Sequence, residues 1–479
     1  MPRLPPRLLL RFALYLAGCW GIALARWIGR SFGETSLEQI LWHLRYSEHA
    51  AVHMGSLFLW EFSFEVLLFP AVIALVLALA HTVAADRLRG LARRMLKAGP
   101  AIAVGGALGA LLAQFSVFSY AAAQFGPDRF AEVFVDPAHV RLKQGSQRRN
   151  VVLVYVESLE QTYGDPAVFG RDLLAPTRTL GGVSFDYRPM PGATWTMAAM
   201  VATQCGVPLK VYSETDVRRQ PGHKSFLPGA TCLGDVLQSH GWRNVFLGGA
   251  PLSFAGKGTF LQDHGYDEAW GREEWERAGL QPDELNEWGL VDSALWQRAR
   301  TRLDQLHAGG QPFNLTLLTM DTHNPHGFRS PYCSQRGARD FEGIVACAGA
   351  QIAAFVEDAR AKGYLKDTVI VVVGDHLAFP NPAWDKLEQA GERRRIFNLF
   401  VGENLPPANT KELLPFDLFP SLLDLAGLEV GGDRLGLGYS AFGPMEVARP
   451  ASRAEEQSLA ALRGSSGYNR LWQAEAPGD

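Results

Sequence analysis

Cysteine is scarce in this chain, and neither sign of charge dominates. The 479 residues include five cysteines, and 46 lysines and arginines nearly balance 49 aspartates and glutamates, for a net charge of −3. Because nucleic-acid-binding proteins need a basic surface, this balance predicts no nucleic-acid partner. The cysteine spacings also do not match a zinc-binding motif.

The few cysteines carry information about the compartment. Cys19 lies in an apolar run, which leaves Cys205, Cys232, Cys333 and Cys347 later in the chain. An even number permits two disulfides in an oxidising compartment, and four cysteines allow three connectivities. We expect local pairing, Cys205 with Cys232 and Cys333 with Cys347, and free buried thiols are the alternative.

Hydrophobic residues, by contrast, are abundant at 47% and are concentrated near the N-terminus. Three apolar runs each approach the ~20 residues that a helix needs to cross a bilayer. They are Leu8–Ala25, Val66–Ala85 and Ala101–Ala123. We predict a three-span transmembrane anchor over residues 1–125. Long buried core helices are the alternative, and the clustering of the three runs disfavours them.

Basic residues predict the orientation of these spans. Arginines precede the first span, and the basic segment Arg87–Lys97 separates the second from the third. Both places should be cytoplasmic, so everything after about residue 125 should be exported. Ala23–Ala25 also resembles a signal-peptide cleavage site, and cleavage would leave the exported side unchanged. We favour an uncleaved anchor.

The exported part has the pattern of an α/β layer fold. Residues 126–149 are polar and punctuated by proline, as in a connector. From Asn150 onward, apolar strand-like runs alternate with helix-like ones. We therefore predict an α/β domain over residues 150–450, with a central sheet and helices on both faces, and a polar tail over 451–479.

Two of the strand-like runs end in metal-ligand side chains. Val151–Val156 is followed by Glu157, and Val369–Val373 is followed closely by Asp375 and His376. Both runs are continuously apolar, as in strands buried on both faces. The ligand crevice of such sheets lies off the carboxyl ends of the strands, so these ligands can converge on one divalent cation. Carboxylate and imidazole ligands suit Mn, Zn or Mg.

Other polar residues can complete a catalytic site. Thr196 is a candidate nucleophile because a metal lowers the pKa of an adjacent hydroxyl. His323 and His326 follow a strand and can act as acid or base, and Lys257 can bind phosphate. Each residue alone is more often structural. Thr194 is the competing hydroxyl, because it shares a face with Thr196 in an extended segment.

Four tryptophans in the middle of the chain are candidates for stacking on sugar rings. They are Trp270, Trp275, Trp288 and Trp296. Large aromatic side chains more often pack in a core, so core packing is the favoured interpretation for all four.

Several segments together resemble the sulfatase/alkaline phosphatase superfamily. They are Asn150–Glu160, Pro191–Leu209, Gly374–His376 and Phe416–Gly427. Within the superfamily the chain is similar to the lipoteichoic acid synthase branch and to the phosphoglycerol transferases that modify osmoregulated periplasmic glucans. The resemblance implies an alkaline-phosphatase-like central sheet over about residues 145–445.

The resemblance also implies roles for individual residues. It implies that one metal ion is bound by Glu157, Thr196, Asp375 and His376, and that Thr196 is also the nucleophile. The expected ion is Mn, with Zn or Mg as alternatives. His323 matches a substrate-site histidine. Lys257 stands where lipoteichoic acid synthases have a phosphate-binding arginine.

Two departures from the family narrow the expected function. Ala255 replaces a tryptophan of the lipoteichoic acid synthases, which argues against lipoteichoic acid synthesis. The segment Cys205–Leu209 lacks the C/S-x-P-x-R pattern that formylglycine formation requires, which disfavours sulfate ester hydrolysis.

The expected reaction transfers phosphoglycerol from phosphatidylglycerol to a periplasmic glucan. It proceeds through a glycerophospho-threonine intermediate and releases diacylglycerol. The expected location is the bacterial inner membrane, with the catalytic domain in the periplasm. A phosphoethanolamine transferase of the same fold is one alternative. The other is a non-catalytic, membrane-tethered glucan-binding protein.

Overall fold

The computed structural model describes most of the chain and divides it into two compact units. The described residues are 5–33, 35, 37–46, 56–85, 87–125, 127–145, 147–210, 225–443, 449–463 and 466–473. One unit comprises Met1–Leu41 and Ala51–Ala122, and the other comprises Trp42–Ala50 and Ala123–Asp479. We describe each unit by itself.

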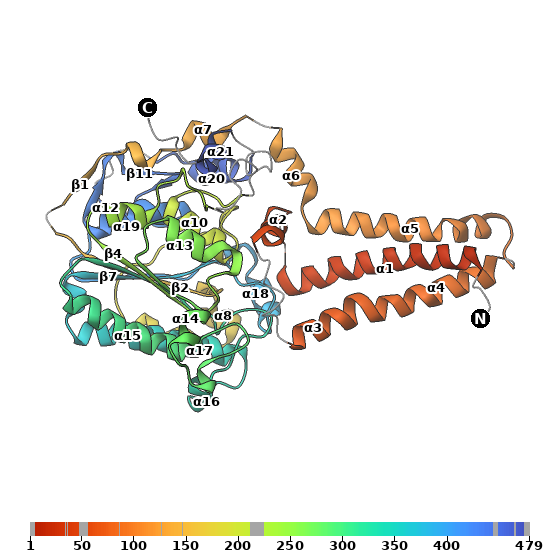
Figure 1. Cartoon of the computed structure of the whole chain (residues 1–479), viewed down its shortest axis with the longest axis horizontal. Helices are drawn as coiled ribbons and strands as arrows, with labels where there is room; N and C mark the ends of the chain where they lie inside the picture. The colour runs from red at the N-terminus through yellow and green to blue at the C-terminus, as the bar shows by residue number, and fades with distance from the viewer. Residues whose placement is uncertain are drawn as a thin grey trace. The chain divides into compact units, whose positions relative to one another are not determined.

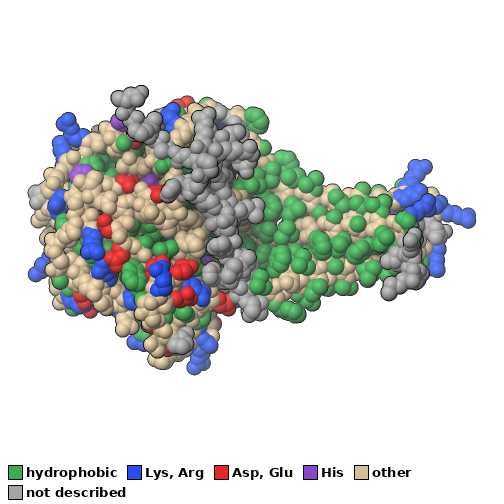
Figure 2. All heavy atoms as spheres, in the orientation of Figure 1, with side chains coloured by type: hydrophobic (Ala, Val, Ile, Leu, Met, Phe, Trp, Pro, Cys, Tyr) green, Lys and Arg blue, Asp and Glu red, His purple; other side chains and the backbone are tan. Residues whose placement is uncertain are grey.

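The first unit is built from long apolar helices. Its elements are α1 (Pro6–Phe32), the start of α2 (Leu37–Tyr46), α3 (Ser56–Phe62), the π-helical turn η2 (Ser63–Leu68), α4 (Phe69–Ala85), α5 (Gly90–Gln114) and α6 (Val117–Gln124). Three stretches are long and apolar enough to cross a membrane, namely Pro6–Phe32, Leu59–Ala84 and Gly90–Gln114. Large apolar side chains are exposed along them, and Figure 2 shows their hydrophobic surface.

Small residues let α1 and α5 approach closely. A Cβ added to Gly18 would lie 2.7 Å from the Cβ of Ala103, and one added to Gly21 would lie 2.7 Å from the Cβ of Ala107. Membrane helices pack through such small-residue contacts because lipid supplies no hydrophobic drive between them. The third long helix begins at Gly90 and ends at Gln114, earlier than the run 101–123, because the chain turns at Ser116 with φ 48°.

A six-stranded sheet forms the centre of the second unit (Figure 1). Its order is β5 (Glu268–Trp270), β4 (Arg243–Gly248), β6 (Phe313–Leu318), β2 (Asn150–Val156), β7 (Thr368–Gly374) and β8 (Asn398–Val401). All neighbours pair in parallel except β8, which runs antiparallel to β7.

Alternate residues of the strands enter two different cores, as the pleat requires. In β2, Val151, Leu153 and Tyr155 belong to one core, and Val152 and Val154 belong to the other. The first core includes residues of α10 (Thr196–Cys205), α12 (Leu233–Ser239), α13 (Lys257–Asp263) and α19 (Leu418–Ala426). The second includes residues of α15 (Asp292–Ala308) and α17 (Phe341–Ala361). The predicted α/β fold with helices on both faces of the sheet is confirmed (Figure 1).

Shorter elements complete this unit. The helices are α7 (Arg129–Val133), η3 (Pro137–His139), η4 (Gln161–Gly164), α8 (Pro166–Phe169), α9 (Ala175–Arg178), η5 (Phe254–Gly256), α14 (Arg272–Arg277), η6 (Pro282–Glu284), α16 (Pro331–Gln335), η7 (Tyr364–Lys366), α18 (Trp384–Ala390), η8 (Gly391–Arg393), η9 (Pro415–Asp417), η10 (Gly431–Asp433), α20 (Arg453–Leu462), α21 (Ser466–Asn469) and η11 (Arg470–Trp472). The small strands are β1 (Leu142–Gln144), β3 (Asp186–Tyr187), β9 (Glu412–Leu413), β10 (Leu428–Val430), β11 (Arg434–Leu435) and β12 (Gly438–Tyr439).

The expected connector and tail are more ordered than the sequence pattern indicates. Within 126–149, β1 pairs with β10. Within 451–479, Arg453 of α20 is 5% exposed, and its guanidinium lies 2.6 Å from the Asp417 carboxylate. A polar composition does not imply a loose tail here, because the charged side chain is buried with a charged partner.

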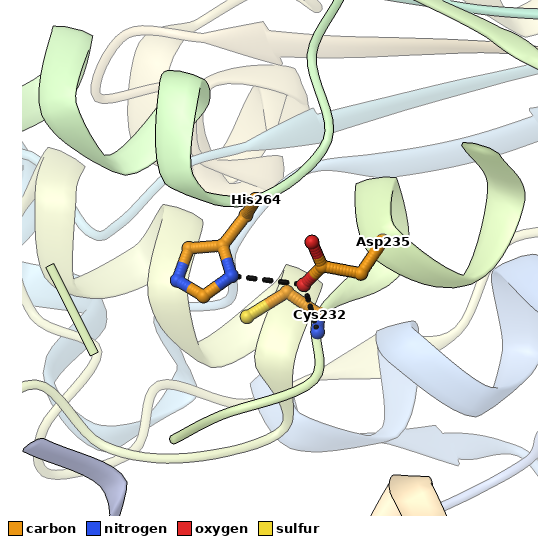
Figure 3. Close-up of side chains that lie close together, drawn as sticks. All are labelled: Cys232, Asp235 and His264. Carbon is orange, nitrogen blue, oxygen red and sulfur yellow. Dashed lines mark hydrogen bonds and ion pairs between the residues drawn. The ribbon is translucent and has the colours of Figure 1, made fainter. Parts of the chain in front are cut away.

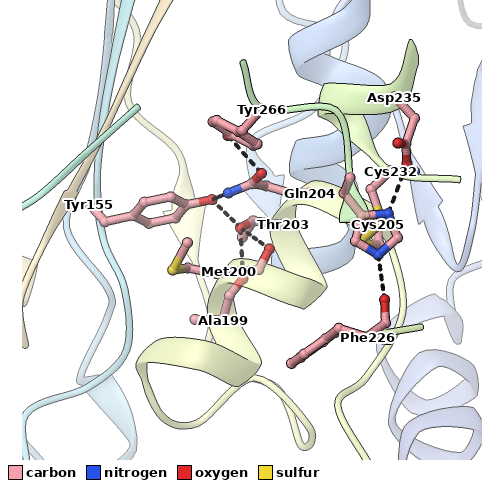
Figure 4. Close-up of a disulfide and its surroundings, with 11 residues drawn as sticks. Tyr155, Ala199, Met200, Thr203, Gln204, Cys205, Phe226, Cys232, Asp235 and Tyr266 are labelled. Carbon is pink, nitrogen blue, oxygen red and sulfur yellow. Dashed lines mark hydrogen bonds and ion pairs between the residues drawn. A yellow bond between two sulfur atoms is a disulfide. The ribbon is translucent and has the colours of Figure 1, made fainter. Parts of the chain in front are cut away.

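Two disulfides link the four later cysteines. Cys205 pairs with Cys232, and Cys333 pairs with Cys347, which confirms the expected local pairing. Cys19 is free. The first bridge joins the end of α10 to the residue before α12 (Figure 4).

We expect the Cys205–Cys232 bridge to stabilise the second unit. The bridge closes a 27-residue separation, so replacing both cysteines with serine should lower the free energy of unfolding by about 3.5 kcal/mol on chain-entropy grounds. Chemical denaturation of the purified protein measures this. The control is Cys19→Ser, which breaks no bridge. An unchanged midpoint in the double variant would contradict the prediction.

Candidate active site

The register between β2 and β7 brings the predicted ligands together. These parallel strands pair over their whole lengths, and Val156 lies opposite Gly374. The next residues are Glu157 and Asp375, so both leave the sheet at the same point of its carboxyl edge. The Ser158 N–H donates to Asp375 Oδ1 at 2.8 Å, which ties the two strand ends together.

Glu157, Asp375 and His376 form a compact, buried cluster. Their ligand atoms all lie within 4.8 Å of one another, and each residue is 2–3% exposed. The His376 Nδ1–H donates to the Leu377 carbonyl at 2.8 Å. That bond directs Nε2 toward the two carboxylates, at 3.6 Å from Glu157 Oε1 and 3.4 Å from Asp375 Oδ2.

The electrostatics of this cluster fit a cation. Burial, and then the Glu157 charge, raise the pKa of Asp375 to about 7. Burial lowers the pKa of His376, but the neighbouring carboxylates outweigh it and raise that pKa overall. Asp375 Oδ2 is buried and accepts no hydrogen bond from the described residues. Two buried carboxylates and an imidazole suit a hard or borderline divalent ion, so these residues fit the predicted metal.

Thr196 lies beside this cluster at the first residue of α10. Its Oγ1 is 3.4 Å from Glu157 Oε2 and 3.5 Å from His376 Nε2. Thr194 is exposed, and no contact joins it to the cluster within the described residues. Of the two hydroxyls, the structure therefore brings Thr196 to the predicted ligands.

A buried polar network holds α10 against the sheet (Figure 4). Tyr155 of β2 shares a 2.6 Å hydrogen bond with Thr203, and the Gln204 amide donates to the Tyr155 hydroxyl at 3.3 Å. The Tyr266 hydroxyl donates to Gln204 Oε1 at 2.9 Å. Because Tyr155 stands two residues before Glu157, the strand that leads to this predicted ligand also positions the helix that carries Thr196.

Lys257 begins α13 and is 4% exposed. Burial lowers its pKa to about 8, against the smaller opposing effects of Glu273 and Glu157. The ammonium lies 6.0 Å from the centre of the Phe246 ring. It has no ion-pair or hydrogen-bond partner among the residues that the structure describes. A buried ammonium without a charged partner can form an ion pair with a phosphate oxygen.

Trp42 and His43, which sequence reasoning did not select, contact the residues around Lys257 and Thr196. The Trp42 indole N–H donates to the Ala255 carbonyl at 3.1 Å, and Ala255 has a φ of 55°. The His43 ring lies 4.9 Å from the Trp195 ring and 5.6 Å from the Phe254 ring. Only tertiary contacts reveal this role, because no local pattern relates residue 42 to residue 255.

His323 lies in the loop after β6. Two threonine hydroxyls of this loop form hydrogen bonds with the backbone of Glu157. The Glu157 N–H donates to the Thr319 hydroxyl at 3.2 Å, and the Thr322 hydroxyl donates to the Glu157 carbonyl. The His323 Nδ1–H donates to the Asn324 carbonyl at 2.6 Å, which leaves Nε2 as the acceptor. His326 is exposed, and its predicted role stays a prediction.

A second group with metal-ligand chemistry is Cys232, Asp235 and His264 (Figure 3). The Cys232 sulfur is already bonded to Cys205. The two ring nitrogens of His264 contact Asp235 Oδ2 and the Phe226 carbonyl, each at 2.9 Å. Because both ring nitrogens and the sulfur already have partners, this group joins α12 to the end of α13.

The sequence matches a family model that extends over most of the sheet. The sulfatase family model matches residues 149–428, from the residue before β2 to the first residue of β10. The match therefore includes the buried cluster, Thr196, Lys257 and His323. The chain belongs to the sulfatase family.

Curated relatives of this sulfatase-family protein are phosphoglycerol transferases. It is 36% identical to phosphoglycerol transferase I of Escherichia coli O139:H28 over 323 residues, which cover 65% of this chain and 41% of that protein. It is 35% identical to the phosphoglycerol transferase I of Escherichia coli O127:H6 over 347 residues, with 70% and 44% covered. The chain spans about two fifths of the length of these relatives.

A solved structure has the same fold. An alkaline phosphatase superfamily protein from Vibrio parahaemolyticus aligns with a TM-score of 0.51 at 18% identity, covering 75% of this chain and 98% of that one. Sulfatases and alkaline-phosphatase-like enzymes use a divalent metal ion, in agreement with the Glu-Asp-His cluster found here.

We expect Asp375→Asn to lose bound divalent ion. The substitution keeps the shape of the side chain but removes one ligand charge from the buried cluster, which should also abolish activity. Elemental analysis of the purified protein measures the metal. The matched control is Asp424→Asn, a half-buried carboxyl elsewhere whose pKa burial also raises to about 7. An undiminished metal content in Asp375→Asn would remove this residue from the ligand set.

Proposed function

We propose that this protein transfers phosphoglycerol from phosphatidylglycerol to a periplasmic glucan. The observation that carries the proposal is the convergence of Thr196 with Glu157, Asp375 and His376 in a chain 36% identical to phosphoglycerol transferase I. A vestigial, glucan-binding protein would not need to retain a hydroxyl, two carboxylates and an imidazole in one buried cluster.

Thr196 is the proposed nucleophile. Its Oγ attacks the phosphorus of the lipid, and the bond from phosphorus to the diacylglycerol oxygen breaks. Thr196 also opens α10, a helix of ten residues, whose N-terminal dipole favours an anionic oxygen and an incoming phosphate. A sugar hydroxyl then displaces Thr196 from the phosphorus and completes the transfer.

His323 and Lys257 are proposed to serve the proton and the phosphate. As Thr196 attacks, His323 Nε2 takes the proton of its hydroxyl and gives it to the departing diacylglycerol oxygen. In the second step His323 Nε2 takes the proton of the sugar hydroxyl and returns it to the Thr196 oxygen. The buried Lys257 ammonium attracts a phosphodiester oxygen. His326 is a further candidate for substrate binding.

Glu157, Asp375, His376 and Thr196 would hold the metal, with manganese proposed and zinc or magnesium as alternatives. When bound, such an ion lowers the pKa of the threonine hydroxyl and neutralises charge on the phosphoryl group. The buried carboxylates supply the negative charge that this cation requires.

The proposed location is the bacterial inner membrane with the catalytic unit in the periplasm. Three apolar helices support an anchor, and the basic segment Arg87–Lys97 supports an orientation that exports the second unit. The two disulfides agree with an oxidising compartment. A lipid donor would then be met at the outer leaflet.

We expect Thr196→Ala to abolish release of diacylglycerol from phosphatidylglycerol. Loss of a covalent nucleophile costs orders of magnitude in rate, whereas Thr196→Ser keeps a hydroxyl and should retain activity. Fluorescent phosphatidylglycerol reports the release. Mass spectrometry of the trapped protein should show glycerophosphate on the peptide that contains Thr196.

Thr194→Ala is the matched control for this experiment. It should remain active, because Thr194 is exposed and apart from the cluster. If Thr194→Ala is inactive and Thr196→Ala turns over lipid, the nucleophile is misassigned. A phosphoethanolamine adduct in place of glycerophosphate would change the proposed donor to phosphatidylethanolamine.

We also expect donor binding to weaken as the pH rises through about 8. Burial lowers the pKa of Lys257 to about 8, so the ammonium loses its charge above that pH, while the lipid phosphodiester keeps its own. The KM for phosphatidylglycerol should rise across this range. In Lys257→Arg the rise should disappear, because a guanidinium stays charged. An identical pH profile in both proteins would exclude Lys257 from phosphate binding.

A further inference from the structure

The four tryptophans from the middle of the chain occupy different environments. Trp275 and Trp296 are 6% and 2% exposed and belong to the core beneath the sheet. Trp270 is half-buried and stacks on Trp275, with ring centres 4.6 Å apart. Trp288 is also half-buried, but its ring lies 4.5 Å from the ring of His323, at the candidate active site. Core packing therefore does not account for Trp288.

The loop that carries Trp288 is held in one conformation. Asn286 Oδ1 accepts hydrogen bonds from the N–H groups of Trp288, at 2.8 Å, and Gly289, at 2.9 Å. Gly289 has a φ of 148°, and a Cβ there would lie 1.9 Å from the Gly249 carbonyl oxygen at the end of β4. The Leu290 N–H donates to that same oxygen at 3.1 Å. The loop is thereby fastened to the carboxyl edge of the sheet.

A pair of buried aspartates fastens this loop to the loop of His323. Asp292 begins α15, and its carboxylate accepts from the N–H groups of Met320, at 2.6 Å, and Asp321, at 3.1 Å. Asp321 Oδ1 in turn accepts from the Asp292 N–H at 3.2 Å. Trp288 lies four residues before Asp292, and His323 lies two residues after Asp321. The contact between the two aspartates therefore holds Trp288 and His323 near each other.

The indole offers both kinds of contact that a pyranose ring uses. Its aromatic face can cover the apolar C–H face of a sugar, and its N–H can donate to a hydroxyl. The indole Nε1–H of Trp288 donates to no acceptor within the described residues. A glycerol headgroup has no such ring face, so this chemistry suits the sugar acceptor better than the lipid donor.

We propose that Trp288 is the acceptor-binding residue of this enzyme: a glucose ring of the glucan stacks on its indole and presents a hydroxyl to His323. The proposal rests on the proposed function. In the second half-reaction the sugar oxygen bonds to phosphorus as the bond from phosphorus to Thr196 Oγ breaks. The hydroxyl proton passes to His323 Nε2 and from there to the released Thr196 oxygen. Without a bound sugar, water takes the same position and glycerol phosphate is released instead.

The test measures how the intermediate divides between sugar and water. The full-length protein in detergent receives fluorescent phosphatidylglycerol and an oligosaccharide of β-linked glucose. Diacylglycerol, glycerophosphorylated oligosaccharide and free glycerol phosphate are all quantified. Trp288→Ala should lower the ratio of transfer to hydrolysis about tenfold or more, as loss of an apolar specificity contact does. Transfer and hydrolysis draw on the same intermediate, so this ratio does not depend on how fast the variant releases diacylglycerol.

Two further variants keep the test specific. Trp288→Phe retains a ring but not the N–H, and it should restore part of the ratio through a lower acceptor KM than that of Trp288→Ala. The matched control, Trp270→Ala, removes a half-buried tryptophan that pairs with another aromatic ring and should leave the ratio unchanged.

The outcomes separate this inference from the proposed function. Wild-type transfer with an unchanged ratio in Trp288→Ala would overturn the acceptor role of Trp288 and leave the proposed function standing. An equal fall in the ratio in Trp270→Ala would also overturn it. A wild-type protein that releases no diacylglycerol from phosphatidylglycerol, or transfers nothing to the oligosaccharide, would overturn the proposed function and this inference with it.

Discussion

The parallel pairing of β2 with β7 is the constraint on which the candidate site depends. Because Val156 lies opposite Gly374, Glu157 and Asp375 leave the sheet side by side. A slip of one residue would move every side chain of the strand to the other face and shift the strand end by about 3.3 Å. Two separate hydrophobic cores resist that slip, since alternate residues of β2 enter each one.

Concentrating acidic side chains at this buried edge costs free energy, which a bound cation would offset. Burial raises the pKa of Asp375 to about 7 and lowers that of Lys257 to about 8, so both charges are held where water does not stabilise them. A bound cation would stabilise the carboxylate, and a bound phosphate would stabilise the ammonium, more strongly here than at an exposed site. The polar network beneath α10 and the Cys205–Cys232 bridge keep Thr196 beside them.

Sequence patterns predicted the central strands and the disulfide pairing better than they predicted the edges of the fold. The β-branched runs before Glu157 and Asp375 predict strands from neighbouring residues alone. The prediction therefore does not depend on how many residues separate the two runs. The short edge strand β5 has a weaker pattern. The ordered segment around Arg453 was missed because its burial depends on Asp417, a distant residue.

The sequence by itself determined an α/β domain after three apolar helices, and it determined which residue types end the central strands, because periodicity and strand ends are local properties. Only the tertiary structure decided which side chains meet. It brought Thr196, rather than Thr194, to the acidic cluster, and it separated Trp288 from three tryptophans of similar sequence context. It also joined Trp42 to Ala255. The physical reason is that such contacts join residues far apart in the chain, whose positions the packing of the whole core determines.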